Sequence, residues 1–222
     1  MRSSYAAVMR KPLAVLAAAT VLALVLVASA SPAQRARPRV TVIGDSVITA
    51  VAYTSQARGL LGRDVDLHWL AVVCRRLVQP SCWYDGTRPP TALEVIQTNG
   101  SSLGQTVIVE SGYNEYVQQY ASDIGTVMNA LVAAGVQNVL WMTLREQRSD
   151  YATMNTQIRA AATRWPQMTV VDWNAASKNQ DWFWDDGIHV NYPGAMGMSR
   201  LLRKFVVAYA CGGSCVHRLP TD

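Results

Sequence analysis

A serine, a histidine and an acid occur in this 222-residue chain at positions suited to nucleophilic catalysis. Ser46 lies in a Gly-Asp-Ser triplet that directly follows an apolar run, and His189 ends an Asp-Gly-Ile-His run late in the chain. A serine nucleophile needs a base, and histidine is the usual base near neutral pH. Asp186, three residues before His189, can fold back through a glycine turn and orient the imidazole. The pattern predicts Ser46 as nucleophile, His189 as base and Asp186 as its orienting acid.

Stabilising the negative oxygen of an ester transition state requires hydrogen-bond donors near the serine. Ser46 opens a predicted helix, whose first N–H groups and positive dipole end suit that task. Asn114 follows a second apolar run, so its amide would reach the same region. Each motif also has a purely structural explanation: Asp45 or Ser46 caps a helix, Asn114 caps the next one, and His189 sits on an ordinary turn.

Short β-branched runs alternate with helix-compatible segments along the chain. Strands are predicted at residues 39–43, 65–69, 106–110, 138–143 and 168–172. Helices are predicted at residues 47–60, 91–97, 116–134, 151–164 and 193–209. This alternation is typical of an α/β three-layer sandwich, with a parallel sheet of about five strands covered on both faces. Sites in such sheets lie beyond the carboxyl ends of the strands. The Ser46 and Asn114 motifs follow predicted strands directly, and the Asp186–His189 run lies in a loop before the last helix.

Taken together and in this order, the motifs resemble those of the SGNH (GDSL-type) hydrolases, over residues 39–210 approximately. The resemblance implies a flavodoxin-like fold and a serine esterase that needs no metal or cofactor. It also implies an oxyanion hole made by the Ser46 N–H, the Asn114 amide and a glycine N–H after the second strand. Gly86 is our candidate for that glycine, although the segment at residues 74–76 is an alternative. Glu115 departs from the family, which usually has Asp there.

Three further residues are assigned to substrate binding: Asp45 beside the serine, Arg145 after the fourth strand, and Trp184 just before the late acid pair. Arg145 would bind an anionic or hydroxylated group, and Trp184 would pack on a sugar ring or acyl chain. A solvated charged loop and core packing are the competing explanations. We expect an ester of a small molecule, a glycan or a lipid as substrate, and a monomeric enzyme.

The function predicted is cleavage of carboxylic esters through an acyl-enzyme. An O-acyltransferase that modifies cell-envelope glycans is the nearest alternative, with a sugar hydroxyl replacing water. A non-catalytic envelope-binding module on the same fold is the alternative from another class. The formal charge of +5 comes partly from Arg2, Arg10 and Lys11 in the first 30 residues, so the charge gives no case for nucleic-acid binding.

Residues 1–30 have the features of an export signal: a basic start, an uncharged stretch at 12–30 and Ala28-Ser29-Ala30 at its end. An uncleaved membrane anchor is the alternative, since 19 apolar residues nearly span a bilayer. Residues 31–38 are predicted to be a linker and residues 39–222 the catalytic domain. The protein is therefore expected to be secreted or held in the cell envelope.

Four cysteines fit an exported protein and predict two disulfides. Four cysteines allow three pairings, of which the short loops favour Cys74–Cys82 and Cys211–Cys215. A metal site made of Cys211, Cys215 and His217 is the alternative, but its spacing is not a standard zinc pattern.

Overall fold

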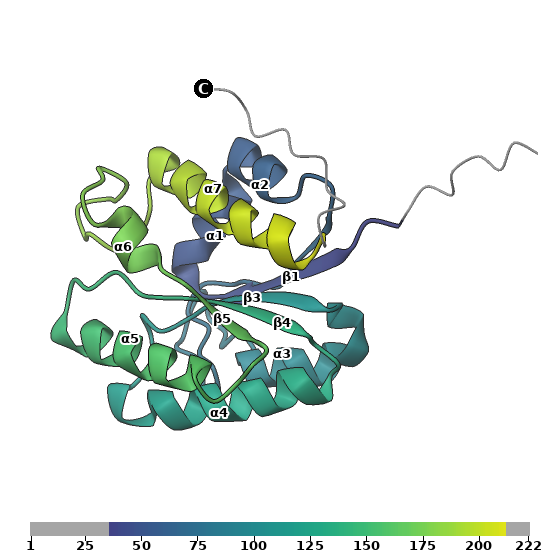
Figure 1. Cartoon of the computed structure of the whole chain (residues 1–222). Coiled ribbons are helices and arrows are strands. Elements are labelled where there is room, and N and C mark those ends of the chain that lie inside the picture. Colours follow the sequence, from purple (N-terminus) through teal and green to yellow (C-terminus); the bar gives the residue numbers. More distant parts are fainter. Residues whose placement is uncertain (1–35, 212–222) are drawn as a thin grey trace, which may run out of the picture. The chain divides into compact units, whose positions relative to one another are not determined.

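A parallel five-stranded sheet forms the centre of the computed structural model, which describes residues 36–211 (Figure 1). The strand order is β2-β1-β3-β4-β5, and every neighbouring pair is parallel. The strands are β1 (Arg39–Gly44), β2 (Asp66–Trp69), β3 (Thr106–Glu110), β4 (Asn138–Met142) and β5 (Met168–Val171). Order and direction agree with the flavodoxin-like arrangement expected from the sequence.

Helices cover both faces of the sheet (Figure 1). One face carries α1 (Ser46–Tyr53), α2 (Ser55–Leu61), α6 (Trp173–Ser177) and α7 (Tyr192–Tyr209). The other face carries α3 (Ala92–Asn99), α4 (Val117–Ala133) and α5 (Ser149–Ala162), and a 3-10 turn, Gly100–Leu103, follows α3. The predicted three-layer α/β sandwich is confirmed.

Alternating side chains of β1, β3, β4 and β5 enter two separate hydrophobic cores. In β3, Val107 and Val109 pack with α3, α4 and α5, whereas Ile108 packs with α1 and α7. All three side chains are fully buried. A strand buried on both faces is apolar at most positions, which is why these runs were recognisable in the sequence.

Two details of the helices differ from the sequence prediction. Residues 47–60 form two helices, because Thr54 is extended (φ −99°, ψ 100°) and its N–H closes α1 by bonding to the Ala50 carbonyl. The short α6 was not predicted at all. Its N-cap is Asp172, whose side chain accepts a hydrogen bond from the Ala175 N–H.

Cys74 and Cys82 form a disulfide, as predicted, with their Cα atoms 5.2 Å apart. The second predicted bridge and the alternative metal site both involve Cys215, which lies outside the described residues. The export segment at residues 1–30 and most of the linker lie outside them as well. Between residues 36 and 211, no helix has both the length and the apolar character needed to cross a membrane.

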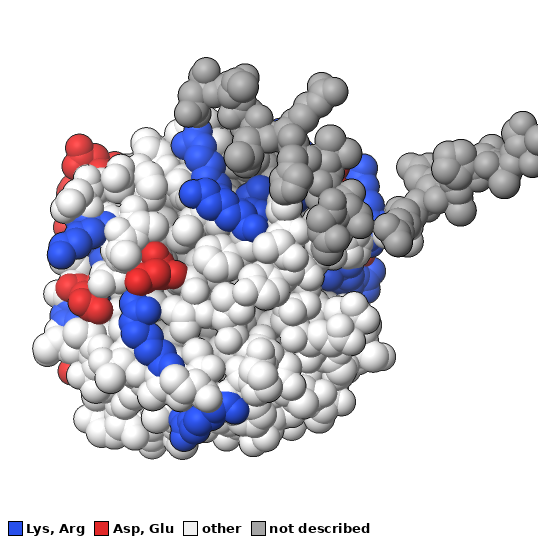
Figure 2. Space-filling view, in the orientation of Figure 1, with Lys and Arg blue, Asp and Glu red and all other residues white. Residues whose placement is uncertain are grey.

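Charged side chains are spread over the face that Figure 2 shows. Lys and Arg form separate small groups there, some of them next to Asp or Glu, and most of the visible surface is uncharged. No continuous basic area of the kind that tracks a nucleic-acid backbone is visible on this face. The expectation that nucleic acid is not a partner stays a prediction.

Candidate active site

Ser46 is the first residue of α1 and lies immediately beyond the carboxyl end of β1. Asp45 is the N-cap of this helix, and its Oδ1 accepts a hydrogen bond from the Val47 N–H at 3.0 Å. Since the first N–H groups of a helix have no partner within it, the Ser46 N–H is left for another acceptor. The local sequence thus places a hydroxyl and a free backbone donor side by side.

The assignment of Asp45 to substrate binding was wrong. Its side chain is completely buried and is held by donors from α1 and from the loop after β3. Oδ2 of Asp45 lies 3.4 Å from both the Gly112 N–H nitrogen and the Asn114 Nδ2. The carboxylate therefore fastens the end of β3 to the start of α1, and a ligand in solvent cannot contact it.

The loop that carries His189 is a tight hairpin. The Gly187 N–H donates to the Trp184 carbonyl at 2.8 Å, and the Trp184 N–H donates to the His189 carbonyl at 2.9 Å. Asp185 and Asp186 occupy the two central positions of this turn, followed by Gly187 in the left-handed region (φ 67°). The glycine is needed there, since few other residues adopt this conformation without strain.

Asp186 contacts both the backbone and the ring of His189. Its Oδ1 accepts hydrogen bonds from the N–H groups of Ile188 (2.8 Å) and His189 (2.9 Å), while Oδ2 lies 2.6 Å from His189 Nδ1. Partial burial disfavours the Asp186 carboxylate, but these hydrogen bonds outweigh it and lower its pKa. Asp186 is therefore an anion fixed against one side of the imidazole at neutral pH.

The other side of the imidazole faces the serine. Nε2 of His189 lies 2.9 Å from the Ser46 Oγ, across 143 residues of sequence. The three side chains form one hydrogen-bonded chain from carboxylate through imidazole to hydroxyl. With Nδ1 protonated toward Asp186, Nε2 is free to take the hydroxyl proton. The arrangement has the geometry required to activate a serine.

Asn114 lies near this chain, in the loop after β3. Its Nδ2 lies 3.4 Å from Asp45, the residue that precedes Ser46. Its carbonyl accepts a hydrogen bond of 2.6 Å from the Arg76 Nε. The amide is thus held next to the start of α1, where the Ser46 N–H also lies.

A second buried carboxyl beneath the serine was missed in the sequence. Glu110, the last residue of β3, is buried, and its Oε2 accepts a hydrogen bond from the Ile48 N–H at 3.2 Å. Burial, and then the charge of Asp45, raise the pKa of Glu110 well above its ordinary value. Burial also raises the pKa of Asp45, so the protonated form is favoured at both of these neighbouring carboxyls. The only sequence signal for this was a charged residue ending an otherwise apolar strand.

Glu115 occupies the position where the SGNH hydrolases, which the sequence resembles, usually have Asp. Its Oε1 accepts hydrogen bonds from the Leu77 N–H (2.5 Å) and the Ser111 Oγ (3.3 Å). Burial raises the pKa of this carboxyl to about 7. The longer side chain reaches the loop after β2 and connects it to the Asn114 segment.

Gly86 lies in an exposed turn between Tyr84 and Thr87, whose backbones pair with each other. None of the hydrogen bonds within the described part of the chain connects Gly86 with Ser46 or Asn114. The contacts with Asn114 and Glu115 come from other residues of the same loop, Arg76, Leu77 and Cys82. The role proposed for Gly86 stays a prediction without a contact to support it.

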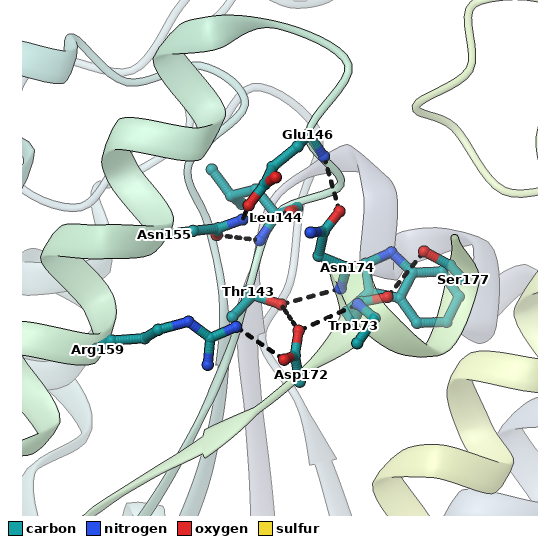
Figure 3. Close-up of polar contacts among 10 residues, drawn as sticks. Thr143, Leu144, Glu146, Asn155, Arg159, Asp172, Trp173, Asn174 and Ser177 are labelled. Carbon is teal, nitrogen blue, oxygen red and sulfur yellow. Dashed lines mark hydrogen bonds and ion pairs between the residues drawn. The ribbon is translucent and has the colours of Figure 1, made fainter. Parts of the chain in front are cut away.

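Arg145 lies in the loop after β4, and a polar network fixes this loop (Figure 3). Asn155 of α5 accepts a hydrogen bond from the Leu144 N–H and donates to the Leu144 carbonyl, both at 2.7 Å. Asn174 accepts one from the Glu146 N–H at 3.0 Å. The Arg145 guanidinium stacks 3.7 Å from the centre of the Phe183 ring, which belongs to the His189 loop.

Trp184 is 64% exposed and lies two residues before Asp186. Its neighbour Trp182 instead stacks on the buried Trp173, with ring centres 5.7 Å apart. Core packing therefore explains Trp182, whereas Trp184 is available to a ligand. Its assignment to substrate binding stays a prediction.

A cavity of about 550 Å³ lies between the loop closed by the disulfide and the start of α3. It is lined by Val78, Pro80, Ser81, Arg88, Pro89, Pro90, Thr91, Leu93 and Glu94. None of the residues assigned to catalysis or binding lines it. Across residues 36–211, no group of three or more His, Cys, Asp or Glu side chains is placed to hold a metal ion.

No protein-family model and no curated protein matches the sequence. Solved structures with a similar fold include a carbohydrate acetylesterase family member from Sinorhizobium meliloti (TM-score 0.61, 13% identity, covering 77% of this chain and 98% of that one). A candidate arylesterase from Agrobacterium tumefaciens has a TM-score of 0.60 and 12% sequence identity, and the match covers 77% of this chain and 99% of that one. A family two carbohydrate esterase from Cellvibrio japonicus has a TM-score of 0.53 and 11% sequence identity, and the match covers 78% of this chain and 61% of that one. At these identities the similarity establishes the α/β fold alone.

Proposed function

We propose that this protein is an exported serine esterase of the SGNH type, which cleaves carboxylic esters through an acyl-enzyme. One observation carries the proposal: the chain of hydrogen bonds from Asp186 through His189 to Ser46, at 2.6 and 2.9 Å. The fold shared with carbohydrate and aryl esterases supports it.

The mechanism follows from the geometry of these groups. Ser46 Oγ attacks the ester carbonyl while His189 Nε2 takes its proton, and Asp186 stabilises the imidazolium. The Ser46 N–H and the Asn114 amide donate to the developing oxyanion. His189 then gives the proton to the leaving alcohol, which departs. Water repeats the sequence on the acyl-enzyme and releases the acid.

Hydrolysis of a panel of esters tests this proposal. Short and long acyl p-nitrophenyl esters and acetylated sugars are assayed with the wild type, Ser46→Ala and Ser55→Ala. Ser55 is a matched control, because it is also the first residue of a helix but is exposed on α2. We expect Ser46→Ala to lose nearly all turnover with little change in stability, because Asp45 and not Ser46 caps the helix, and we expect Ser55→Ala to keep its turnover.

Unchanged turnover in Ser46→Ala would refute the nucleophile assignment. Adding a sugar acceptor to the same reactions separates hydrolysis from acyl transfer, because a transferase would form the acylated sugar at the expense of the free acid.

A further inference from the structure

The chain leaving β2 runs alongside the start of the nucleophile's helix. Beyond Trp69, the last residue of β2, the Leu70 N–H donates to the Val42 carbonyl (2.8 Å) and the Val72 N–H to the Gly44 carbonyl (3.1 Å). Gly44 is two residues before Ser46. The backbone of residues 70–72 therefore extends the pairing with β1 to the edge of the candidate site.

A turn with an unusual residue follows at once. The Arg75 N–H approaches the Val72 carbonyl at 3.4 Å, so Cys74 is the third residue of a four-residue turn. Cys74 has φ 70°, in the left-handed region where turns of this kind favour glycine. No hydrogen bond within residues 36–211 uses the Cys74 N–H. The Cys74 N–H thus has no hydrogen-bond partner among the described residues, while the Cys74 side chain is held in a disulfide.

The partner cysteine contacts the Asn114 amide. Sγ of Cys82 lies 3.9 Å from the Asn114 Oδ1, and the Cys82 N–H donates to the Cys74 carbonyl at 3.3 Å. The Arg76 Nε bond to the Asn114 carbonyl joins the same two segments. The bridge therefore touches the turn at one end and the amide at the other.

We propose that the Cys74–Cys82 disulfide is a positioning device for transition-state stabilisation. It holds Cys74 in the left-handed conformation with its N–H presented as an oxyanion donor, and it keeps the Asn114 amide in place. This rests on the proposed esterase function. The Cys74 N–H would then be the backbone donor of the oxyanion hole that is expected after the second strand. Gly86 was the candidate for this donor in the sequence.

Removing the bridge should therefore lower kcat with little effect on KM, because these donors bind the oxyanion more strongly than the ground-state carbonyl. We expect the kcat of Cys74→Ala/Cys82→Ala to fall about 10- to 100-fold, while its KM stays within about threefold of the wild type. This loss in kcat is somewhat smaller than the loss expected when an oxyanion donor is removed completely. Cys74→Gly/Cys82→Ala should recover about tenfold of this loss, because glycine adopts the left-handed conformation without a bridge.

Asp85→Gly is the matched control. Asp85 also has a positive φ (49°) in the same loop, but it lies in the exposed Tyr84–Thr87 turn. We expect its kcat to equal that of the wild type. All variants are assayed with one p-nitrophenyl ester well below their thermal midpoints, which are measured alongside.

Two results would overturn the proposal. One is a wild-type kcat in Cys74→Ala/Cys82→Ala, and the other is a kcat in the glycine variant no higher than in the alanine variant at equal thermal midpoints. Ser46→Ala in the same assay separates the two hypotheses: turnover that survives Ser46→Ala refutes the esterase assignment itself, and the bridge proposal with it. Ser46-dependent turnover that is indifferent to the bridge refutes the bridge proposal alone.

Discussion

Adjacent aspartates in the His189 loop have different positions in one turn. Asp186 turns its carboxylate back onto two N–H groups and the imidazole, whereas Asp185 lies at the exposed first central position. A spacing of three residues selects Asp186 from the sequence, and the hairpin explains why. Only the second central residue of this turn has its side chain within reach of His189.

Replacing each aspartate by asparagine separates their roles. Asp186→Asn should lower turnover by a thousandfold or more, on the order of the loss seen when a serine-protease triad loses its carboxylate, because the imidazolium is no longer stabilised. Asp185→Asn should stay within about tenfold, or roughly 1.4 kcal/mol. Both are measured as kcat on one ester. If Asp185→Asn lost its activity and Asp186→Asn kept it, Asp185 and not Asp186 would be the acid that orients His189.

Much of the candidate site could be predicted from residue types, but the buried contacts that hold its residues in place could not. Ser46, Asn114 and His189 are recognisable because each ends a strand or lies in a turn with characteristic neighbours. The burial of Asp45 depends on donors 67 and 69 residues away, which no local pattern contains. The same is true of the Glu115 contact with Leu77, 38 residues apart.

At the scale of elements, α5 fixes the loop after β4 through one side chain. Asn155 is buried and satisfies both backbone groups of Leu144, which is itself fully buried (Figure 3). Its amide also donates to the Glu146 Oε1 at 3.0 Å. The loop that carries Arg145 therefore depends on a residue ten positions later in the chain.

Truncating this asparagine should destabilise the fold. Asn155→Ala leaves the N–H and carbonyl of Leu144 buried without partners, at a cost of about 2–3 kcal/mol. Thr156→Ala, on the exposed side of the same helix, should change stability by about 0.5 kcal/mol or less. Urea unfolding measures both free energies. Equal values for the two variants would show that the Asn155 hydrogen bonds contribute nothing net.

The helices and strands were predictable where their residues form a clear hydrophobic pattern. Strands β1, β3 and β4 are apolar runs buried on both faces, so their periodicity is unambiguous. The break at Thr54 has neither glycine nor proline, and α6 has only five residues, so neither left a signal. The loop at 70–90 follows a path set by the disulfide and by contacts with residues 114 and 115.

For the whole molecule, two buried carboxyls make stability depend on pH. Burial raises the pKa of Glu115 from 4.5 to about 7, and burial with the charge of Asp45 raises the pKa of Glu110 well above 4.5. A carboxyl with a raised folded pKa contributes stability that is fully present below its unfolded pKa. That contribution is lost as the pH rises through the folded pKa. For Glu115 the loss spans about pH 4.5 to 7.

We therefore expect the thermal midpoint to fall between about pH 5 and about pH 8. Glu115→Gln should reduce this fall, because its amide does not ionise and its carbonyl still accepts from Leu77. Groups with lowered pKa, such as Asp172 and Asp186, lose their contribution only below about pH 4, outside this window. Exposed Asp181→Asn serves as control. Equal pH dependence in the wild type and Glu115→Gln would contradict the raised pKa.

Covalent labelling of Ser46 tests the central claim most directly. The wild type is treated with an alkyl fluorophosphonate, and the intact mass and the labelled peptide are measured, with Ser46→Ala and Ser55→Ala in parallel. The account predicts a single adduct on Ser46, absent from Ser46→Ala and retained in Ser55→Ala, because only a serine activated by His189 attacks the phosphorus. An adduct on another residue, or no adduct on a preparation that hydrolyses esters, would contradict it.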